Sequence, residues 1–174
     1  IIAENISDNA KFRKIIRDNT YNFGLIKSKK KKNSEDENKI YDMYYDYEER
    51  VKFIKPHRIL ALNRGENEGI LSVSIDNDRD RVIEYINKRT IKNEKSFVVD
   101  TVKEAIEDSY KRLIEPSIER EIRSELTEKA KEQAIKVFGK NSKQLLMQPP
   151  IKDITVMGFD PAYRTGCKIA VIDK

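Results

Sequence analysis

The sequence predicts a mainly α-helical fold: a helical scaffold with long amphipathic helices, a short strand near residues 70–75 and a terminal β-hairpin. Apolar residues recur every three or four positions between 99 and 138, which is the period of a helix with one buried face. Six glycines and five prolines in 174 residues are few for a many-turned all-β fold. The alternating stretch ILSVSID adds the strand.

The chain is long enough for one or two domains with a core of their own. We expect three segments. Residues 1–96 form an N-terminal helical region with a basic loop and the short strand. Residues 97–147 form an amphipathic helix pair, and residues 151–174 form a hairpin.

The first half of the N-terminal region combines a helix, a lysine run and a tyrosine cluster. ENISDNAKFRKIIRDN predicts a helix around Ile6, Ala10 and the cluster at 12–16. KSKKKK, residues 27–32, is followed at once by polar NSEDENK, so we interpret it as a solvated loop. Four tyrosines at 41–47 could stack nucleobases. Partly buried packing is the favoured interpretation, because their neighbours are acidic and repel phosphates.

The second half of this region predicts a helix followed by the strand. HRILALNRGENEG follows Pro56 and indicates a helix that closes at Arg64-Gly65. In ILSVSID, the alternation of Leu71, Val73 and Ile75 with polar residues has the strand period of two. His57 lies at the expected helix start, where a capping or packing role is favoured because no nucleophile motif accompanies it.

Two amphipathic helices are expected after residue 97. The first has apolar residues at three- and four-residue steps: Val99, Val102, Ile106, Tyr110 and Leu113. Pro116 should kink this helix or lie in the first turn of the next one. The second helix has a stripe at four-residue spacing: Ile118, Ile122, Leu126, Ala130, Ala134 and Phe138. Gly139 is the expected C-terminal stop.

The segment 154–174 predicts a hairpin in which ITVMGFD and CKIAVIDK are the strands and PAYRTG is the turn. Pro161 fixes one backbone angle and Gly166 frees another, which suits a tight reversal. Both strands are apolar on both faces, as in strands from the interior of a covered sheet.

Basic residues concentrate at the start of the chain. Residues 1–32 hold nine lysines and arginines against three carboxylates. Such runs attract phosphate backbones without reading sequence. The candidate nucleic-acid-binding residues are Lys11, Arg13, Lys14, Arg17, Lys27, Lys29, Lys30, Lys31 and Lys32. A solvated surface without a ligand is the alternative.

Composition also excludes some classes of protein. One cysteine, Cys167, and one histidine cannot supply the four ligands of a usual structural zinc site. No run approaches the roughly 20 apolar residues that span a bilayer, so no membrane partner is expected. The absence of a signal pattern and of a cysteine pair favours a cytoplasmic location.

Several stretches in order resemble the Tex family of bacterial transcription accessory proteins. They include IIAENISDN, IYDMYYDYEE, KPHRILALNRGENEGILSVSI, KRLIEPSIEREIRSELTEKAKEQAIKVFGKN, QLLMQPP and GFDPAYRTGCKIAVID. The resemblance implies a larger cytoplasmic protein that also has an RNase H-like domain of the YqgF type, helix-hairpin-helix elements and an OB-fold RNA-binding domain. It implies RNA or DNA as partners, mainly through domains absent here, and a contact with the transcription machinery. By this resemblance the chain is an internal fragment that ends in the first hairpin of the YqgF-type domain.

Asp160 matches the first acidic position of the RNase H-like pattern and is the one candidate catalytic residue. Active nucleases of that fold gather several carboxylates around two magnesium ions. One carboxylate cannot build that site, so the favoured interpretation is a turn-capping role, with no metal site, no cofactor and no enzyme activity in this chain. Magnesium is expected only in an intact RNase H-like domain.

The function predicted is therefore a helical scaffold that carries and orients the nucleic-acid-binding domains of a Tex-like protein. Two alternatives stay open. The intact protein could be a YqgF-type nuclease or resolvase, or the fragment itself could be a basic RNA- or DNA-binding module.

Overall fold

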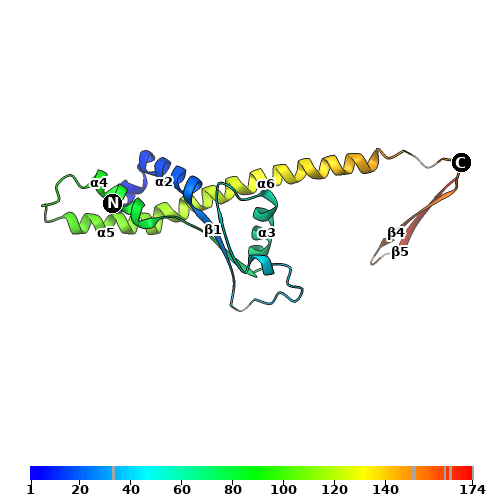
Figure 1. Ribbon diagram of the computed structural model, residues 1–174, viewed down its shortest axis with the longest axis horizontal. Helices are drawn as coiled ribbons and strands as arrows, with labels where there is room; N and C mark the ends of the chain where they lie inside the picture. Colours follow the sequence, from blue (N-terminus) through cyan, green and yellow to red (C-terminus); the bar gives the residue numbers. More distant parts are fainter. Residues whose placement is uncertain (33, 150–151, 163, 165, 174) are drawn as a thin grey trace. The chain divides into compact units, whose positions relative to one another are not determined.

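The computed structural model describes residues 1–32, 34–149, 152–162, 164 and 166–173. They form two compact units, Ile1–Lys136 and Val137–Lys174. The fold is mainly α-helical, as the sequence predicts. In chain order the elements are α1 Ile2–Ser7, α2 Ala10–Phe23, β1 Leu25–Lys30, a 3-10 helix Asp42–Tyr44, β2 Asp46–Arg50, α3 Pro56–Asn67, β3 Leu71–Asp76, α4 Arg79–Thr90, α5 Val99–Ser109, a π-helix Tyr110–Ile114, α6 Glu115–Leu146, β4 Val156–Ala162 and β5 Gly166–Ile172 (Figure 1).

The expected first helix is divided in two at Asn9. The Asn9 side chain accepts hydrogen bonds from the backbone N–H groups of Lys11 (3.0 Å) and Phe12 (3.2 Å). Asparagine is among the best N-cap residues, because its short side chain satisfies the first unpaired donors of a helix. The cap therefore starts α2 afresh at Ala10, after α1 has ended at Ser7.

Residues 27–30 of the lysine run lie in a strand, which corrects the expected basic loop. β1 is the central strand of a three-stranded antiparallel sheet with the order β2-β1-β3. Its inward positions are Ile26 and Ser28, 2% and 1% exposed, so only one apolar side chain marks the strand period. Lys27 and Lys29 occupy the alternate positions, and the strand ends at Lys30. β3 confirms the predicted strand, with alternate residues buried.

The helix after residue 97 is continuous through α5, the π-helix and α6. Pro116 lies in the first turn of α6, one of its two expected positions. A proline has no N–H for the preceding turn, and the π-helical turn lies just before it. The expected stop at Gly139 is wrong, because α6 continues to Leu146. An interior glycine costs a helix only about 1 kcal/mol relative to alanine, which the surrounding helix-forming residues offset.

One buried stripe runs along this helix at strict four-residue spacing. Its members are Ile106, Tyr110, Ile114, Ile118, Ile122, Leu126 and Ala130. Because an α-helix turns about 100° per residue, a four-residue step drifts by about 40°, so the stripe winds around α6. Different elements therefore meet the helix in turn: α1 packs along α5 and the π-helix, side chains of α2 and α3 bond to side chains of α6, and a backbone N–H of β3 donates to Glu119 of α6. The stripe ends before Ala134 and Phe138, which are exposed, contrary to expectation.

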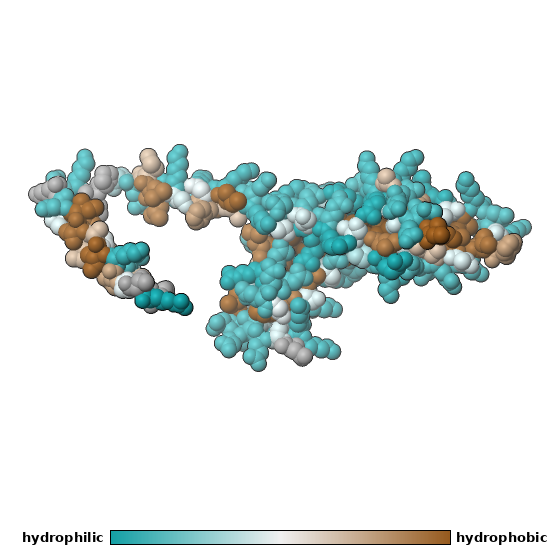
Figure 2. All heavy atoms as spheres, turned by 180° about the vertical axis from the view of Figure 1, so that it is seen from behind, coloured by the Kyte–Doolittle hydropathy of each residue, from teal (hydrophilic) through white to brown (hydrophobic). Residues whose placement is uncertain are grey.

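β4 and β5 form the predicted hairpin in the second unit. The strands pair from Val156 opposite Ile172 to Ala162 opposite Gly166, so β4 runs two residues into the expected turn. Gly166 has φ +77°, a left-handed backbone conformation that glycine adopts freely and that suits the expected reversal. Tyr163 and Thr165, also part of that turn, lie outside the described residues. Figure 2 shows the hydrophobic side chains of this hairpin at the surface, and β5 is exposed throughout.

Within the described residues, no helix is long and apolar enough to cross a membrane.

Candidate nucleic-acid interface

The structure separates the nine candidate basic residues into three groups. Four lie on α2: Lys11, Arg13, Lys14 and Arg17. Three lie on β1: Lys27, Lys29 and Lys30. Lys31 and Lys32 follow the strand. Their availability to a phosphate depends on which of them already have partners.

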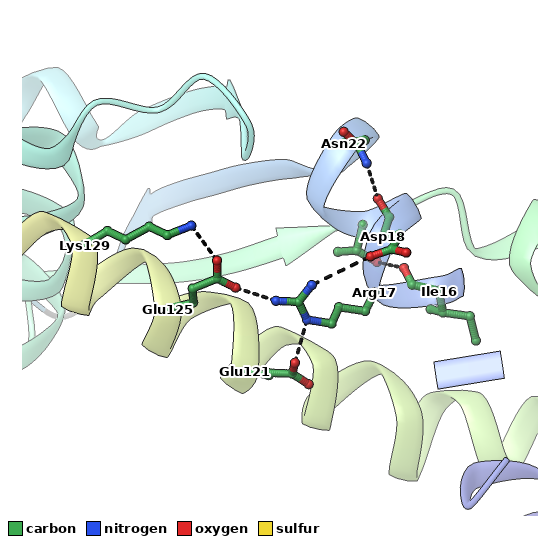
Figure 3. Close-up of polar contacts among 8 residues, drawn as sticks. Ile16, Arg17, Asp18, Asn22, Glu121, Glu125 and Lys129 are labelled. Carbon is green, nitrogen blue, oxygen red and sulfur yellow. Dashed lines mark hydrogen bonds and ion pairs between the residues drawn. The ribbon is translucent and has the colours of Figure 1, made fainter. Parts of the chain in front are cut away.

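Arg17 is held by carboxylates of α6 (Figure 3). Its Nε donates to Glu121 Oε1 at 2.5 Å, and its Nη2 donates to Glu125 Oε2. The other Glu125 oxygen accepts from Lys129 Nζ at 2.5 Å. The Glu121 hydrogen bond raises the pKa of Arg17. Lys129, and to a smaller extent Arg17, lowers the pKa of Glu125 although burial opposes this. This cluster ties α2 to α6 and occupies the guanidinium.

Arg13 has a similar structural role. Its Nη2 donates to Ser117 Oγ on α6 at 2.5 Å, and its Nη1 donates to the Ser7 carbonyl at 3.4 Å. Both arginines of α2 therefore fasten the helix, whereas Lys11 and Lys14 are exposed.

Lys27 is neutralised within the sheet. Its Nζ lies 2.7 Å from Asp76 Oδ2 on β3 and 3.5 Å from Glu48 Oε2 on β2. The hydrogen bond to Asp76 raises the pKa of Lys27. The register also places Lys29 opposite Asp46. The outward face of the sheet thus alternates charge, which weakens its attraction for phosphates.

The far end of β1 leaves more cations exposed. Lys30 Nζ lies 4.7 Å from the centre of the Tyr45 ring. Lys31 and Lys32 are exposed and have no carboxylate within 4.0 Å among the described residues. Lys29–Lys32 and the exposed lysines of α2 are the members of the candidate set that remain available to a phosphate backbone.

The tyrosine cluster is packed, the favoured interpretation of the sequence. Tyr41 and Tyr44 are 2% and 7% exposed. The hydroxyl of Tyr41 donates to Glu68 at 2.8 Å, that of Tyr45 to Asp36 at 2.9 Å, and that of Tyr47 to Glu49. Burial, with help from Glu49, raises the pKa of Tyr47 to about 12. These rings contribute to the core and its rim.

Asp160 lies within β4, opposite Lys168 of β5, and is exposed. Over the described residues, no group of three or more His, Cys, Asp or Glu side chains could hold a metal ion. Asp173 is used elsewhere in the hairpin, where its Oδ1 accepts from the Thr155 hydroxyl at 2.9 Å.

An open hollow of about 720 Å³ lies between α3 and α6. Its charges are matched: Arg64 with Glu68 at 2.9 Å, Lys131 with Glu128 at 2.9 Å, and Arg123 with Glu66. Asn63 Nδ2 donates to Thr127 Oγ1 at 2.9 Å across the same contact. These bonds join the helices and leave no uncompensated charge for a ligand.

The fold and these contacts define a helical scaffold whose exposed lysines lie on α2 and at the end of β1. Residues 1–138 match the family model of the Tex central region. The chain belongs to the Tex family, which confirms the resemblance in the sequence.

The chain is also similar to individual named proteins. The chain is 55% identical over its whole length to the uncharacterized protein YdcI of Bacillus subtilis, and 30% identical to Protein tex of Bordetella pertussis. Over 83% of its length it is 38% identical to the human S1 RNA-binding domain-containing protein 1. It spans 24% of each bacterial protein and 15% of the human one.

Proposed function

We propose that this chain is the scaffold of a Tex-family transcription accessory protein that binds nucleic acid in the cytoplasm. It would carry and orient the domains that bind RNA or DNA, and the whole protein would contact the transcription machinery. The observation that carries this proposal is the set of side-chain bonds that fix three different elements on α6. Arg13 and Arg17 fix α2, Asn63 fixes α3, and Glu119 accepts the backbone N–H of Ile75 on β3 at 3.1 Å.

The relatives support the nucleic-acid part of the proposal. One is named for an S1 RNA-binding domain, and another, from Neisseria gonorrhoeae and 32% identical to this chain, bears the name Transcriptional accessory protein Tex. Because the chain is about a quarter of the length of its bacterial relatives, the partners of the whole protein are inferred from those names.

We also propose that the chain has no catalytic activity of its own. In support, Asp160 lies in an exposed two-stranded hairpin opposite a lysine, without a second carboxylate in its cross-strand pair. A YqgF-type RNase H-like nuclease would need carboxylates from outside this chain to bind magnesium. Incubation of the chain with nucleic acid and magnesium or manganese should give no cleavage. Metal-dependent cleavage that disappears in Asp160→Asn would overturn this.

An insertion series in α6 of the full-length protein tests the scaffold role. One residue inserted after Lys140 turns everything that follows by about 100°, whereas seven residues restore the phase to within roughly 20°. If α6 orients a nucleic-acid-binding domain, the single insertion should weaken binding of a long single-stranded RNA more than the longer one. Equal affinities for both variants and the parent would contradict the scaffold role.

A further inference from the structure

A surface outside the candidate lysines combines exposed aromatic rings with uncompensated cations. It consists of Phe23, Arg50, Lys52, Phe53 and Lys55, and we call it the Phe23–Phe53 surface. Phe23 ends α2, Arg50 ends β2, Lys52 and Phe53 lie in the turn that follows β2, and Lys55 is the N-cap residue of α3. All five side chains are exposed.

One strand pairing and two hydrogen bonds hold the two segments of this surface side by side. Arg50 pairs with Leu25 in the sheet register. The backbone N–H of Val51 donates to the Gly24 carbonyl at 3.0 Å. Lys52 Nζ donates to Asn22 Oδ1 at 3.1 Å. The turn that carries Phe53 is therefore fixed next to the end of α2 that carries Phe23.

The exposure of the rings is built into the fold. Phe23 is 64% exposed and Phe53 is 57% exposed, whereas Val51 and Ile54 on either side of Phe53 are 1% and 9% exposed. Two buried neighbours anchor the turn, so Phe53 cannot turn inward without displacing them. Exposed aromatic rings at neighbouring positions are typical of a binding surface.

The cations of this surface are not the ones that form ion pairs with the nearby carboxylates. Glu49 accepts from Arg58 at 2.8 Å. Glu48 and Asp76 share Lys27, and Asp18 lies 3.7 Å from Arg17. Arg50, Lys52 and Lys55 have no carboxylate within 4.0 Å in the part of the chain that the structure describes. Three cations beside two flat apolar rings are complementary to a phosphate backbone with unstacked bases.

We propose that the Phe23–Phe53 surface binds single-stranded nucleic acid. Bases stack on Phe23 and Phe53, and phosphates lie against Arg50, Lys52 and Lys55. A duplex keeps its base faces stacked internally and cannot use the rings. The proposal rests on the proposed function in one respect, since it takes the protein to be a nucleic-acid binder, and it assigns this chain a contact of its own.

Fluorescence anisotropy with the 174-residue chain tests the proposal. The probes are single-stranded RNA and DNA of about 12 nucleotides and the matching duplex, each at roughly 50 and 200 mM salt. One variant, Phe23→Leu with Phe53→Leu, keeps the apolar character but removes the flat rings. A second, Arg50→Gln with Lys52→Gln and Lys55→Gln, removes the charge. The matched control, Lys92→Gln with Lys95→Gln and Lys103→Gln, removes the same net charge from exposed positions elsewhere.

We expect the leucine variant to bind single strands roughly tenfold more weakly, with little change for the duplex. The glutamine variant should bind both more weakly and lose about two units of salt slope, since each phosphate contact on a single strand contributes about 0.7. The control should stay close to the parent. The ratio of RNA to DNA affinity shows which strand the surface prefers.

Two results would overturn the proposal. In the first, both surface variants bind like the parent, whereas a variant with Gln in place of all four lysines at 29–32 no longer binds. The contact would then belong to the lysine run, and the proposed function would be unaffected. The parent could instead fail to bind any probe, in which case the rings serve another partner. The insertion series on the full-length protein remains an independent test of the scaffold role.

Discussion

Arg17 has two carboxylates of α6 as partners, and its bonds span about a hundred residues of sequence. Surface ion pairs contribute little on average, but a network in which one guanidinium bridges two groups reaches the upper part of the range. Without it, Glu121 and Glu125 would be like charges four residues apart on one helix face, which is destabilising.

We therefore predict that Arg17→Gln lowers the free energy of unfolding by about 1 kcal/mol. Urea denaturation followed by circular dichroism measures it. Lys14→Gln is the matched control, because Lys14 is an exposed cation of the same helix, and it should stay within about 0.5 kcal/mol of the parent. Equal effects of the two substitutions would mean that the cluster adds nothing to stability.

Glu115, at the start of α6, is expected to lower the stability of the fold at neutral pH, so its replacement should have the opposite effect to that of Arg17. Burial, supported by Glu119 and Asp76, raises the pKa of Glu115 although Arg79 and Tyr110 act against it. A carboxyl with a raised folded-state pKa costs stability once it is ionised, above its folded pKa, and that cost disappears as pH falls below its ordinary pKa.

Glu115→Gln should therefore raise the urea midpoint at pH 7, and the gain should vanish near pH 4. Urea titrations at several pH values measure this. A gain that is independent of pH would assign the effect to packing instead of ionisation.

At the residue scale, the sequence shows which side chains are basic. It does not predict which of them already have partners within the protein and which are left to contact a phosphate. The partners of Arg13, Arg17 and Lys27 come from distant segments, and no local pattern encodes them. The Phe23–Phe53 surface was missed for the same reason, because its members come together through the pairing of β1 with β2. The one signal in the sequence was the short stretch RVKFIK, where an aromatic residue lies among cations.

At the scale of elements, the strands show how far local patterns reach. β3 has three buried apolar residues at a period of two and was predicted. β1 buries Ile26 and a serine, and β2 turns only Tyr47 and Glu49 inward, so neither has an apolar period. α5 and α6 were predicted from their stripe, which ends at Ala130 although the helix does not. Apolar periodicity in the sequence identifies elements that have a buried apolar face. It misses strands that are held in place mainly by backbone pairing with their neighbours.

Two glycines in different surroundings make a matched pair of predictions. A Cβ at Gly139 would meet nothing within 4 Å, whereas one at Gly24 would lie 2.4 Å from the Thr20 carbonyl oxygen. Gly139→Ala should increase the helix signal at 222 nm and slow amide exchange in 137–146, with a gain of roughly 0.5–1 kcal/mol in helix stability.

Gly24→Ala should lower the melting temperature, because backbone atoms on the contact cannot move aside cheaply. Thermal melts followed by circular dichroism compare it with the parent. An unchanged melting temperature for Gly24→Ala would show that the junction between α2 and β1 is looser than its geometry indicates.

At the scale of the whole molecule, the two units differ in the apolar surface that they bury. Among the residues that the structure describes, the buried hydrophobic ones all lie between Ala3 and Ala130. The second unit instead exposes large apolar side chains on α6 and on both strands of its hairpin, among them Phe138, Leu146, Met157, Phe159, Ile169 and Val171. The first unit can therefore fold around its own core, whereas the second depends on its hairpin hydrogen bonds and on the helix.

This difference predicts unequal protection in hydrogen exchange. A two-stranded hairpin without a covering layer is marginally stable in water, and local opening is easiest where few apolar contacts are buried. We expect the amides of β4 and β5 to exchange in a dilute monomer at rates close to those of an unfolded chain, while those of β1 and β3 are protected by most of the global unfolding free energy. Mass spectrometry of peptic fragments resolves the two groups.

If the hairpin were protected as strongly as β1 in a verified monomer, its exposed apolar faces would have to be covered by another part of the chain, and the division into a stable core and a dependent hairpin would be wrong. If protection instead rises with protein concentration, the strands pair with a second copy, which is how exposed apolar strands with free edges aggregate.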